Sequence, residues 1–165
     1  LEHSWARNLQ TQYLSGLSSE AVEADPEQAL KLAEDHLRRG FSAVGVTERF
    51  DEFLLACQHA LGWKDILYRR SNTGSTRPCH LAWSSLDTAI IRELQAANRL
   101  DQRLYEYANQ LLDEHIAQVQ DFYRRLAAFQ EENRRHQLRA TSGRRPDGTV
   151  KRLVAQVRGM LRLSR

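Results

Sequence analysis

The feature that most constrains this chain is a succession of helix, strand and helix signals over residues 25–62. Asp25-Pro26 predicts the start of the first helix, because Asp is a favoured N-cap residue and Pro is favoured at the first helical position. Gly40 is typical of a helix end. Between them the helical period is carried by three apolar residues, Ala29, Ala33 and Leu37. A helix with one apolar face is therefore expected over residues 25–40.

The next segment, residues 41–46, reads Phe-Ser-Ala-Val-Gly-Val and is short, apolar and partly β-branched. Such a run predicts a buried strand. Thr47 follows at an N-cap position and begins a second helix, which ends before Gly62. The apolar stripe of this helix consists of Phe50, Phe53, Leu54, Cys57 and Leu61.

A strand this apolar that leads directly into a helix is typical of a parallel sheet covered on both faces. The expected fold class is therefore α/β. One strand cannot form a sheet, and residues 66–68, Ile-Leu-Tyr, offer only a weak second strand. We expect the remaining strands upstream of Leu1. Residues 46–49 would then stand at a strand's carboxyl end, where open α/β sheets bind ligands, although Thr47 and Glu48 also suit helix capping.

The rest of the chain is predicted to be helical. Ser84 or Ser85 can cap a helix over residues 86–97. Apolar residues then recur every three to five positions over residues 100–135 and predict one long amphipathic helix. After a break at residues 141–148, a last basic amphipathic helix carries the apolar residues Val150, Leu153, Val154, Val157, Met160 and Leu161.

Charge is distributed unevenly along the chain. Residues 1–123 hold 12 Lys+Arg and 18 Asp+Glu, whereas residues 124–165 hold 12 and 3. We divide the chain into a body, residues 1–135, and a basic tail, residues 136–165. Such a tail could dock on nucleic acid or an anionic membrane, form a solvated face, or be an arm that packs on another domain. Because no aromatic residues are interleaved with its arginines, stacking on single strands is disfavoured, and no nucleic-acid partner is expected.

Several classes of site find no support in the sequence. No run of about 18 apolar residues predicts a membrane-spanning helix. Cys57 and Cys79 lie outside any CxxC or Cys/His ligand spacing, and the histidines form no HExxH motif, so no metal is expected. No GxxxxGK[ST] phosphate-binding loop occurs. Cys57 is predicted to be a small buried thiol.

Residues 69–80 are the best local candidate for a ligand site. This polar segment combines hydroxyls, a permissive glycine and guanidinium groups: Ser71, Thr73, Ser75, Thr76, Gly74, Arg69, Arg70 and Arg77. Such a mixture can wrap a phosphate. It also suits a solvated surface loop, which composition alone favours by about two to one. His80, beside this segment, is the one histidine to consider as a general base.

Four segments of the chain read together as one pattern. Residues 8–16 read Asn-Leu-Gln-Thr-Gln-Tyr-Leu-Ser-Gly, and residues 43–51 read Ala-Val-Gly-Val-Thr-Glu-Arg-Phe-Asp. Residues 72–78 read Asn-Thr-Gly-Ser-Thr-Arg-Pro, and residues 98–108 begin Asn-Arg-Leu-Asp. In this order they resemble the N-x-Q-T-R-x-L-x-G, V-G-L-T-E-x-F-D, N-x-(S/T)-x-x-R-P and N-x-x-D-x-x-L-Y-x-x-A segments of carbohydrate sulfotransferases. The resemblance is to the sulfotransferase family 2 kind, which includes the heparan sulfate and uronosyl 2-O-sulfotransferases and bacterial relatives. Gln12 stands where that family often has Arg.

This resemblance implies a P-loop-like α/β fold with a parallel sheet, of which the chain would form the C-terminal, predominantly helical part. It implies transfer of a sulfuryl group from 3′-phosphoadenosine 5′-phosphosulfate to a hydroxyl, usually of a carbohydrate. By the same resemblance the loop at residues 69–80 closes over the nucleotide, and its cofactor-binding residues are Asn72, Thr73, Ser75, Thr76 and Arg77. In that family the phosphosulfate loop and the usual catalytic base precede the segment matched by Asn8. We therefore expect this chain alone to be inactive.

An alternative interpretation is a non-catalytic helical interaction module whose basic tail docks on nucleic acid or a membrane. The gene sequence before Leu1 would discriminate between the two, because a sulfotransferase needs a strand and a phosphate-binding turn there. Low cysteine usage and the preference for arginine suit a bacterial cytoplasmic enzyme. A Golgi-luminal enzyme with an upstream anchor is the alternative location.

Overall fold

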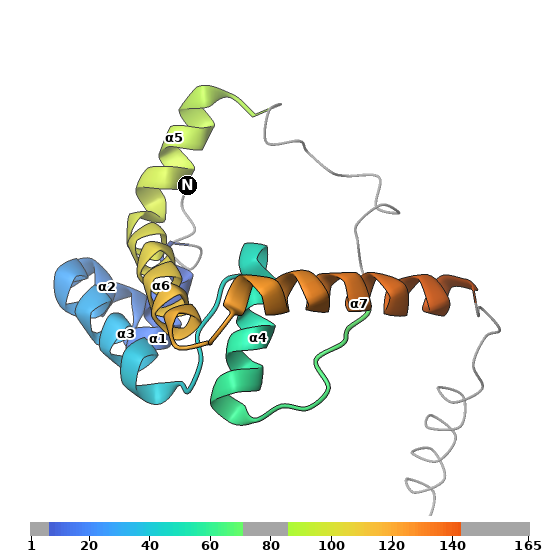
Figure 1. Ribbon diagram of the computed structural model, residues 1–165. Helices are drawn as coiled ribbons and strands as arrows, with labels where there is room; N and C mark the ends of the chain where they lie inside the picture. Colours follow the sequence, from blue (N-terminus) through green and yellow to red (C-terminus); the bar gives the residue numbers. More distant parts are fainter. Residues whose placement is uncertain (1–6, 71–85, 143–165) are drawn as a thin grey trace, which may run out of the picture.

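The computed structural model describes residues 7–70 and 86–142, and within these ranges the chain is predominantly helical and contains no strand. The helical character predicted for the chain is therefore confirmed. In chain order the elements are α1 (Leu9–Ser15), α2 (Ser19–Ala24), α3 (Pro26–Gly40), the 3₁₀ turn η2 (Thr47–Arg49), α4 (Phe50–Leu61), α5 (Thr88–Ala97), α6 (Arg99–Ala117) and α7 (Phe122–Ser142) (Figure 1).

Helix α3 forms as the sequence predicts. The carboxylate of Asp25 accepts a hydrogen bond from the backbone N–H of Gln28 at 3.0 Å, and Pro26 is the first helical residue. This cap satisfies one of the N–H groups that a helix start leaves unpaired. The predicted apolar face is buried, with exposed fractions of 8% or less at Ala29, Ala33 and Leu37.

The strand expected over residues 41–46 is not formed within the described part of the chain. Val44 and Val46 are buried as predicted, but Phe41 is 51% exposed. The backbone is extended at both ends of the segment, with φ −126° and ψ 133° at Phe41 and φ −116° and ψ 152° at Val46. A strand also needs a neighbouring strand to pair with, and residues 7–70 and 86–142 contain none. Residues 66–68, the weak second candidate, have no regular structure either.

The start of the second predicted helix differs from the expectation. Thr47 does not cap a helix with its side chain, because it is itself the first residue of η2. Helix α4 then begins at Phe50 without a side-chain cap. Its end agrees with the prediction: Gly62 has a φ of 68°, a left-handed conformation that favours glycine.

The apolar stripe predicted for α4 is buried only in part. Leu54 and Cys57 are buried and Phe53 is half-buried, whereas Phe50 and Leu61 are 39% and 44% exposed. Burial raises the pKa of the Cys57 thiol, as expected for the small buried thiol that the sequence predicts.

The single long helix predicted over residues 100–135 is in fact two helices. Helix α6 ends at Ala117 and α7 begins at Phe122. The turn between them contains Asp121 in the left-handed conformation, with φ 54°, which Asp tolerates better than most residues. Val119 and Phe122 are both buried at this turn. The apolar spacing therefore continues across the turn, and for this reason the periodicity alone does not reveal that the helix is interrupted there.

Two further boundaries also differ. Helix α5 is capped by Asp87, whose carboxylate accepts a backbone N–H of the first turn at 2.7 Å, whereas the predicted caps, Ser84 and Ser85, lie outside the described residues. Helix α7 continues to Ser142, so the division after residue 135 falls inside this helix. Residues 143–165 of the basic tail lie outside the described ranges, and the division into body and tail stays a prediction.

Helix α6 is the central element, because its two halves contribute to two hydrophobic clusters. Figure 1 shows α1, α2, α3 and α6 gathered together, with α4 and α7 beside them. The first cluster joins α2, α3 and the segment 44–46 to the α6 residues Leu100, Leu104, Ala108 and Leu111. The second joins α4 and α7 to the α6 residues Leu112 and Ile116. Both cores therefore depend on this one helix.

Candidate functional site

The five residues assigned to cofactor binding, Asn72, Thr73, Ser75, Thr76 and Arg77, lie outside the described residues, as does His80. Their roles stay predictions. The described chain includes Arg69 and Arg70, the first two residues of the predicted loop at residues 69–80, but not the rest of it. The surroundings of Tyr68 and Arg70 are therefore the nearest described neighbourhood of the predicted loop.

Tyr68, which leads into that loop, is fastened to both α4 and α7. It donates its backbone N–H to Asn133 Oδ1 at 3.0 Å and its hydroxyl to Asp51 Oδ1 at 2.7 Å. Gln130 donates its Nε2 to the other oxygen of Asp51 at 3.2 Å. Asn133 is polar and yet only 4% exposed, a combination that needs a hydrogen-bond partner. The backbone of Tyr68 supplies it.

A pocket of about 410 Å³ opens beside this network, and we call it the Tyr68 pocket. Its lining residues come from α4, from residues 68–70 and from α7: Asp51, Tyr68, Arg70, Gln130, Asn133, Arg134, Gln137 and Leu138. Two guanidinium groups, three amides and the carboxylate of Asp51 thus surround one opening. Such a lining suits a polar ligand that carries a negative charge and has several hydrogen-bonding edges.

The electrostatics of the pocket determine which groups can act chemically. Burial raises the pKa of the Tyr68 hydroxyl and its hydrogen bond to Asp51 raises it further, whereas Arg70 lowers it. The phenol therefore stays protonated at neutral pH and serves as a donor, not as a general base. Arg134 pairs with Glu131 at 2.8 Å, but both side chains are largely exposed. Arg134 makes two hydrogen bonds to Glu131, at 2.8 and 3.0 Å, so an anionic ligand would have to compete with this carboxylate for the guanidinium.

A separate cluster ties the start of α1 to the start of α6. Asp101 Oδ1 accepts hydrogen bonds from the backbone N–H of Thr11 at 2.8 Å and from its hydroxyl at 2.7 Å. The other oxygen of Asp101 accepts from the backbone N–H of Gln10 at 3.1 Å. Thr11 is fully buried. A carboxylate on α6 therefore caps the first turn of α1.

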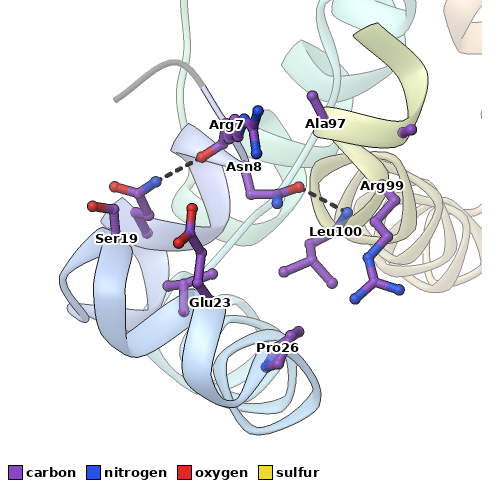
Figure 2. Close-up of a pocket in the computed structure, with 11 residues that line it drawn as sticks. Arg7, Asn8, Ser19, Glu23, Pro26, Ala97, Arg99 and Leu100 are labelled. Carbon is purple, nitrogen blue, oxygen red and sulfur yellow. Dashed lines mark hydrogen bonds between the residues drawn. The ribbon is translucent and has the colours of Figure 1, made fainter. Parts of the chain in front are cut away.

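The cap is reciprocal. Asn8, in the left-handed conformation with φ 47°, uses its Oδ1 to accept the backbone N–H of Leu100 at 2.9 Å (Figure 2). Asn8 also donates its own backbone N–H to Asn98 Oδ1 at 3.1 Å. The side chain that precedes α1 thus caps α6, and the two helix starts hold each other. The joined residues are about ninety positions apart in the sequence.

Arg49 fastens the start of α4 to the same helix α6. Its guanidinium donates to Glu52 at 2.6 Å and to Asp113 at 2.7 Å. These hydrogen bonds, first of all the one to Glu52, raise the pKa of Arg49 above its ordinary value. The guanidinium is therefore already occupied and is a structural group. Glu48, which the sequence places near a possible ligand, is exposed and accepts the Tyr105 hydroxyl at 3.3 Å.

The sequence-based prediction missed the amide row of the Tyr68 pocket. Gln130, Asn133 and Gln137 stand three and four positions apart on α7 and therefore share one helix face. Polar amides at helical spacing, directly beside a buried apolar face, are a signal that could have indicated a polar pocket.

Two kinds of site are not found in the parts of the chain that the structure covers. Among residues 7–70 and 86–142, no group of three or more His, Cys, Asp or Glu side chains is placed to hold a metal ion. None of the helices described is both long enough and apolar enough to cross a membrane.

Comparison with known proteins gives no match: no family model, no curated protein and no solved structure matches this chain. A functional assignment therefore depends on the four sequence segments and on the geometry of the residues within them.

Proposed function

We propose that this chain is part of a sulfotransferase that transfers a sulfuryl group from 3′-phosphoadenosine 5′-phosphosulfate to a hydroxyl of a carbohydrate-type acceptor. The observation that carries the proposal is the reciprocal cap between the segments that begin at Asn8 and at Asn98. Both segments resemble sulfotransferase motifs, and the polar residues that define those motifs bond to one another.

The reciprocal cap links two of the segments that resemble sulfotransferase motifs. The N-x-Q-T pattern requires Asn8 and Thr11, and the N-x-x-D pattern requires Asn98 and Asp101. Each of these four side chains takes part in the junction. A chance similarity in two distant segments would give no reason for their matching residues to be partners. A shared fold gives that reason, because neither helix start keeps its cap if the other motif is lost.

For the fold we propose an α/β architecture in which residues 43–46 form a strand of a sheet whose other strands lie outside the described residues. The backbone at Val46 is already extended, and within residues 7–70 and 86–142 the backbone groups of Val44 and Gly45 make no hydrogen bond. A hollow of about 320 Å³ borders them. A Cβ at Gly45 would lie 2.5 Å from the Phe53 ring, so a glycine there lets α4 pack directly on the segment.

For the nucleotide we propose that the loop containing Asn72, Thr73, Ser75, Thr76 and Arg77 closes over it, with the Tyr68 pocket at the base of that loop. Arg70 and Arg134 supply positive charge there. Transfer is in line: a base takes the proton of the acceptor hydroxyl, while cationic groups neutralise charge on the sulfuryl oxygens. The base and the phosphosulfate loop belong to sequence before Asn8. No metal is proposed, and the compartment proposed is the bacterial cytoplasm.

The experiment that tests this proposal is a calorimetric titration of 3′-phosphoadenosine 5′-phosphate into the protein that the whole gene encodes. Replacing Arg77 by Ala should weaken binding by about 1.5–3 kcal/mol, the range for hydrogen bonds to charged groups. Arg77→Lys should recover only part of that loss, because an ammonium lacks the planar fork of a guanidinium.

Arg124→Ala is the matched control, since Arg124 is an exposed arginine whose side chain pairs with Asp121 three positions before it. Its affinity for the nucleotide should equal that of the unaltered protein. Equal affinities for all three variants and the unaltered protein would remove the loop from the nucleotide site.

A further inference from the structure

A second pocket, separate from the Tyr68 pocket, lies where α2, α3 and the start of α6 meet the residues before α1 (Figure 2). Its volume is about 250 Å³, below the range of about 300–1,000 Å³ that is usual for drug-sized ligands. A ligand that fits it is therefore small. We call it the Glu23–Arg99 pocket after the two charged residues on which the argument depends.

The walls of this pocket are fixed by hydrogen bonds. Gln12 donates its Nε2 to the backbone carbonyl of Arg7 at 2.6 Å, and Leu100 donates its N–H to Asn8 Oδ1 at 2.9 Å; both bonds are drawn in Figure 2. These backbone groups are therefore already satisfied. A pocket whose walls are held in this way is pre-formed, which lowers the entropy lost when a ligand binds.

Glu23 and Arg99 line this pocket from different helices, and within the described ranges neither forms an ion pair, although the charge of Arg99 contributes to lowering the pKa of Glu27. Four positions after each of these two residues, the chain carries another Glu and another Arg. There Glu27 and Arg103 meet at 2.6 Å. Glu23 on α2 and Arg99 on α6 both line the pocket instead.

The floor between the two charges is apolar. Val22 and Leu100 are 2% and 1% exposed, and the other apolar lining residues are Pro26, Ala96 and Ala97. A small hydrocarbon group can contact this surface and remove apolar area from water. The pocket therefore offers one carboxylate, the guanidinium groups of Arg7 and Arg99, and apolar side chains within one small volume.

We propose that the Glu23–Arg99 pocket binds a small zwitterion, a free α-amino acid with an aliphatic side chain. The ligand carboxylate pairs with Arg99, which suits carboxylates through its planar fork. The ligand ammonium pairs with Glu23, and the aliphatic group lies against Val22, Pro26 and Leu100. The site is independent of the proposed sulfotransferase activity.

The test is calorimetric titration of three ligands of matched shape into the full chain: L-leucine, 4-methylpentanoate, which lacks the ammonium, and 3-methylbutylamine, which lacks the carboxylate. L-leucine should bind about tenfold more tightly than either analogue, because only leucine pairs with both charges. Glu23→Gln should weaken leucine and the amine by about tenfold and leave the acid unchanged or tighter. Arg99→Gln should weaken leucine and the acid and leave the amine unchanged.

Arg38→Gln and Glu114→Gln are the matched controls, because they break an exposed ion pair between α3 and α6, at 2.9 Å, and neither residue lines the pocket. Both should bind leucine as the unaltered chain does. The proposal is overturned if leucine does not bind, if it binds no better than its singly charged analogues, or if the Glu23 and Arg99 variants bind it normally. Inorganic phosphate that binds more tightly than leucine, and tighter still after Glu23→Gln, would make this a simple anion site and would also overturn the proposal.

Discussion

Replacing Leu112 by Ala is expected to lower the free energy of unfolding by about 2–5 kcal/mol. Leu112 has no exposed surface and lies on α6, in the cluster that joins this helix to α4 and α7. The substitution removes buried methyl groups and leaves a cavity that the surrounding helices cannot fully close. Urea denaturation followed by circular dichroism measures the change, provided that the transition remains two-state.

Ile90→Ala is the control for this prediction. Ile90 lies on α5 and is 46% exposed, and α5 has no buried residue. The control should change stability by less than about 0.5 kcal/mol, as surface substitutions usually do. If Leu112→Ala changed stability as little as Ile90→Ala does, α6 would not be the helix on which both cores depend.

Asp101→Asn is expected to cost about 1.5–3 kcal/mol of stability. The substitution keeps the size of the side chain but replaces one carboxylate oxygen by an amide that donates hydrogen bonds. That amide would face the N–H and hydroxyl donors of Thr11 and Gln10. Because Thr11 is fully buried, no water could replace Asp101 as the hydrogen-bond partner of its hydroxyl. The same urea titration measures the loss.

Glu106→Gln, on the exposed side of the same helix, is the isosteric control and should leave stability within about 0.5 kcal/mol. A double variant that also carries Asn8→Ala should lose less than the sum of the two single losses, since the two caps hold one junction. An Asp101→Asn variant as stable as the control would mean that the reciprocal cap does not hold α1 on α6.

The parts of the fold that could be predicted are those fixed by local chemistry. Asp25-Pro26 specifies its own cap, and the apolar period of α3 needs no distant partner. The strand at residues 41–46 depends on a neighbour, and no described residue supplies one. The turn at Asp121 was hidden because buried apolar residues stand on both sides of it. The cap and apolar period of α3 were therefore interpreted correctly, whereas the strand, the cap expected at Thr47 and the turn at Asp121 were not.

The candidate site follows the same division. The sequence indicates hydroxyls and arginines near residue 70, but it cannot indicate that α7 brings Gln130 and Asn133 to Tyr68, since that contact spans more than sixty positions. In the same way the motifs that contain Asn8 and Asp101 suggest a family, but the sequence does not indicate that both residues lie at the contact between α1 and α6. Their partnership becomes evident only in three dimensions.

The most direct test of the proposed function is a sulfuryl-transfer assay on the protein that the whole gene encodes. The protein is incubated with 3′-phosphoadenosine 5′-phosphosulfate carrying ³⁵S and with a panel of polysaccharides and oligosaccharides, and the label in the carbohydrate fraction is measured. We predict transfer of label to at least one acceptor, and a lower rate for Arg77→Ala, whose fold should be intact. A folded protein that neither binds 3′-phosphoadenosine 5′-phosphate nor transfers label to any acceptor in the panel would contradict the sulfotransferase assignment.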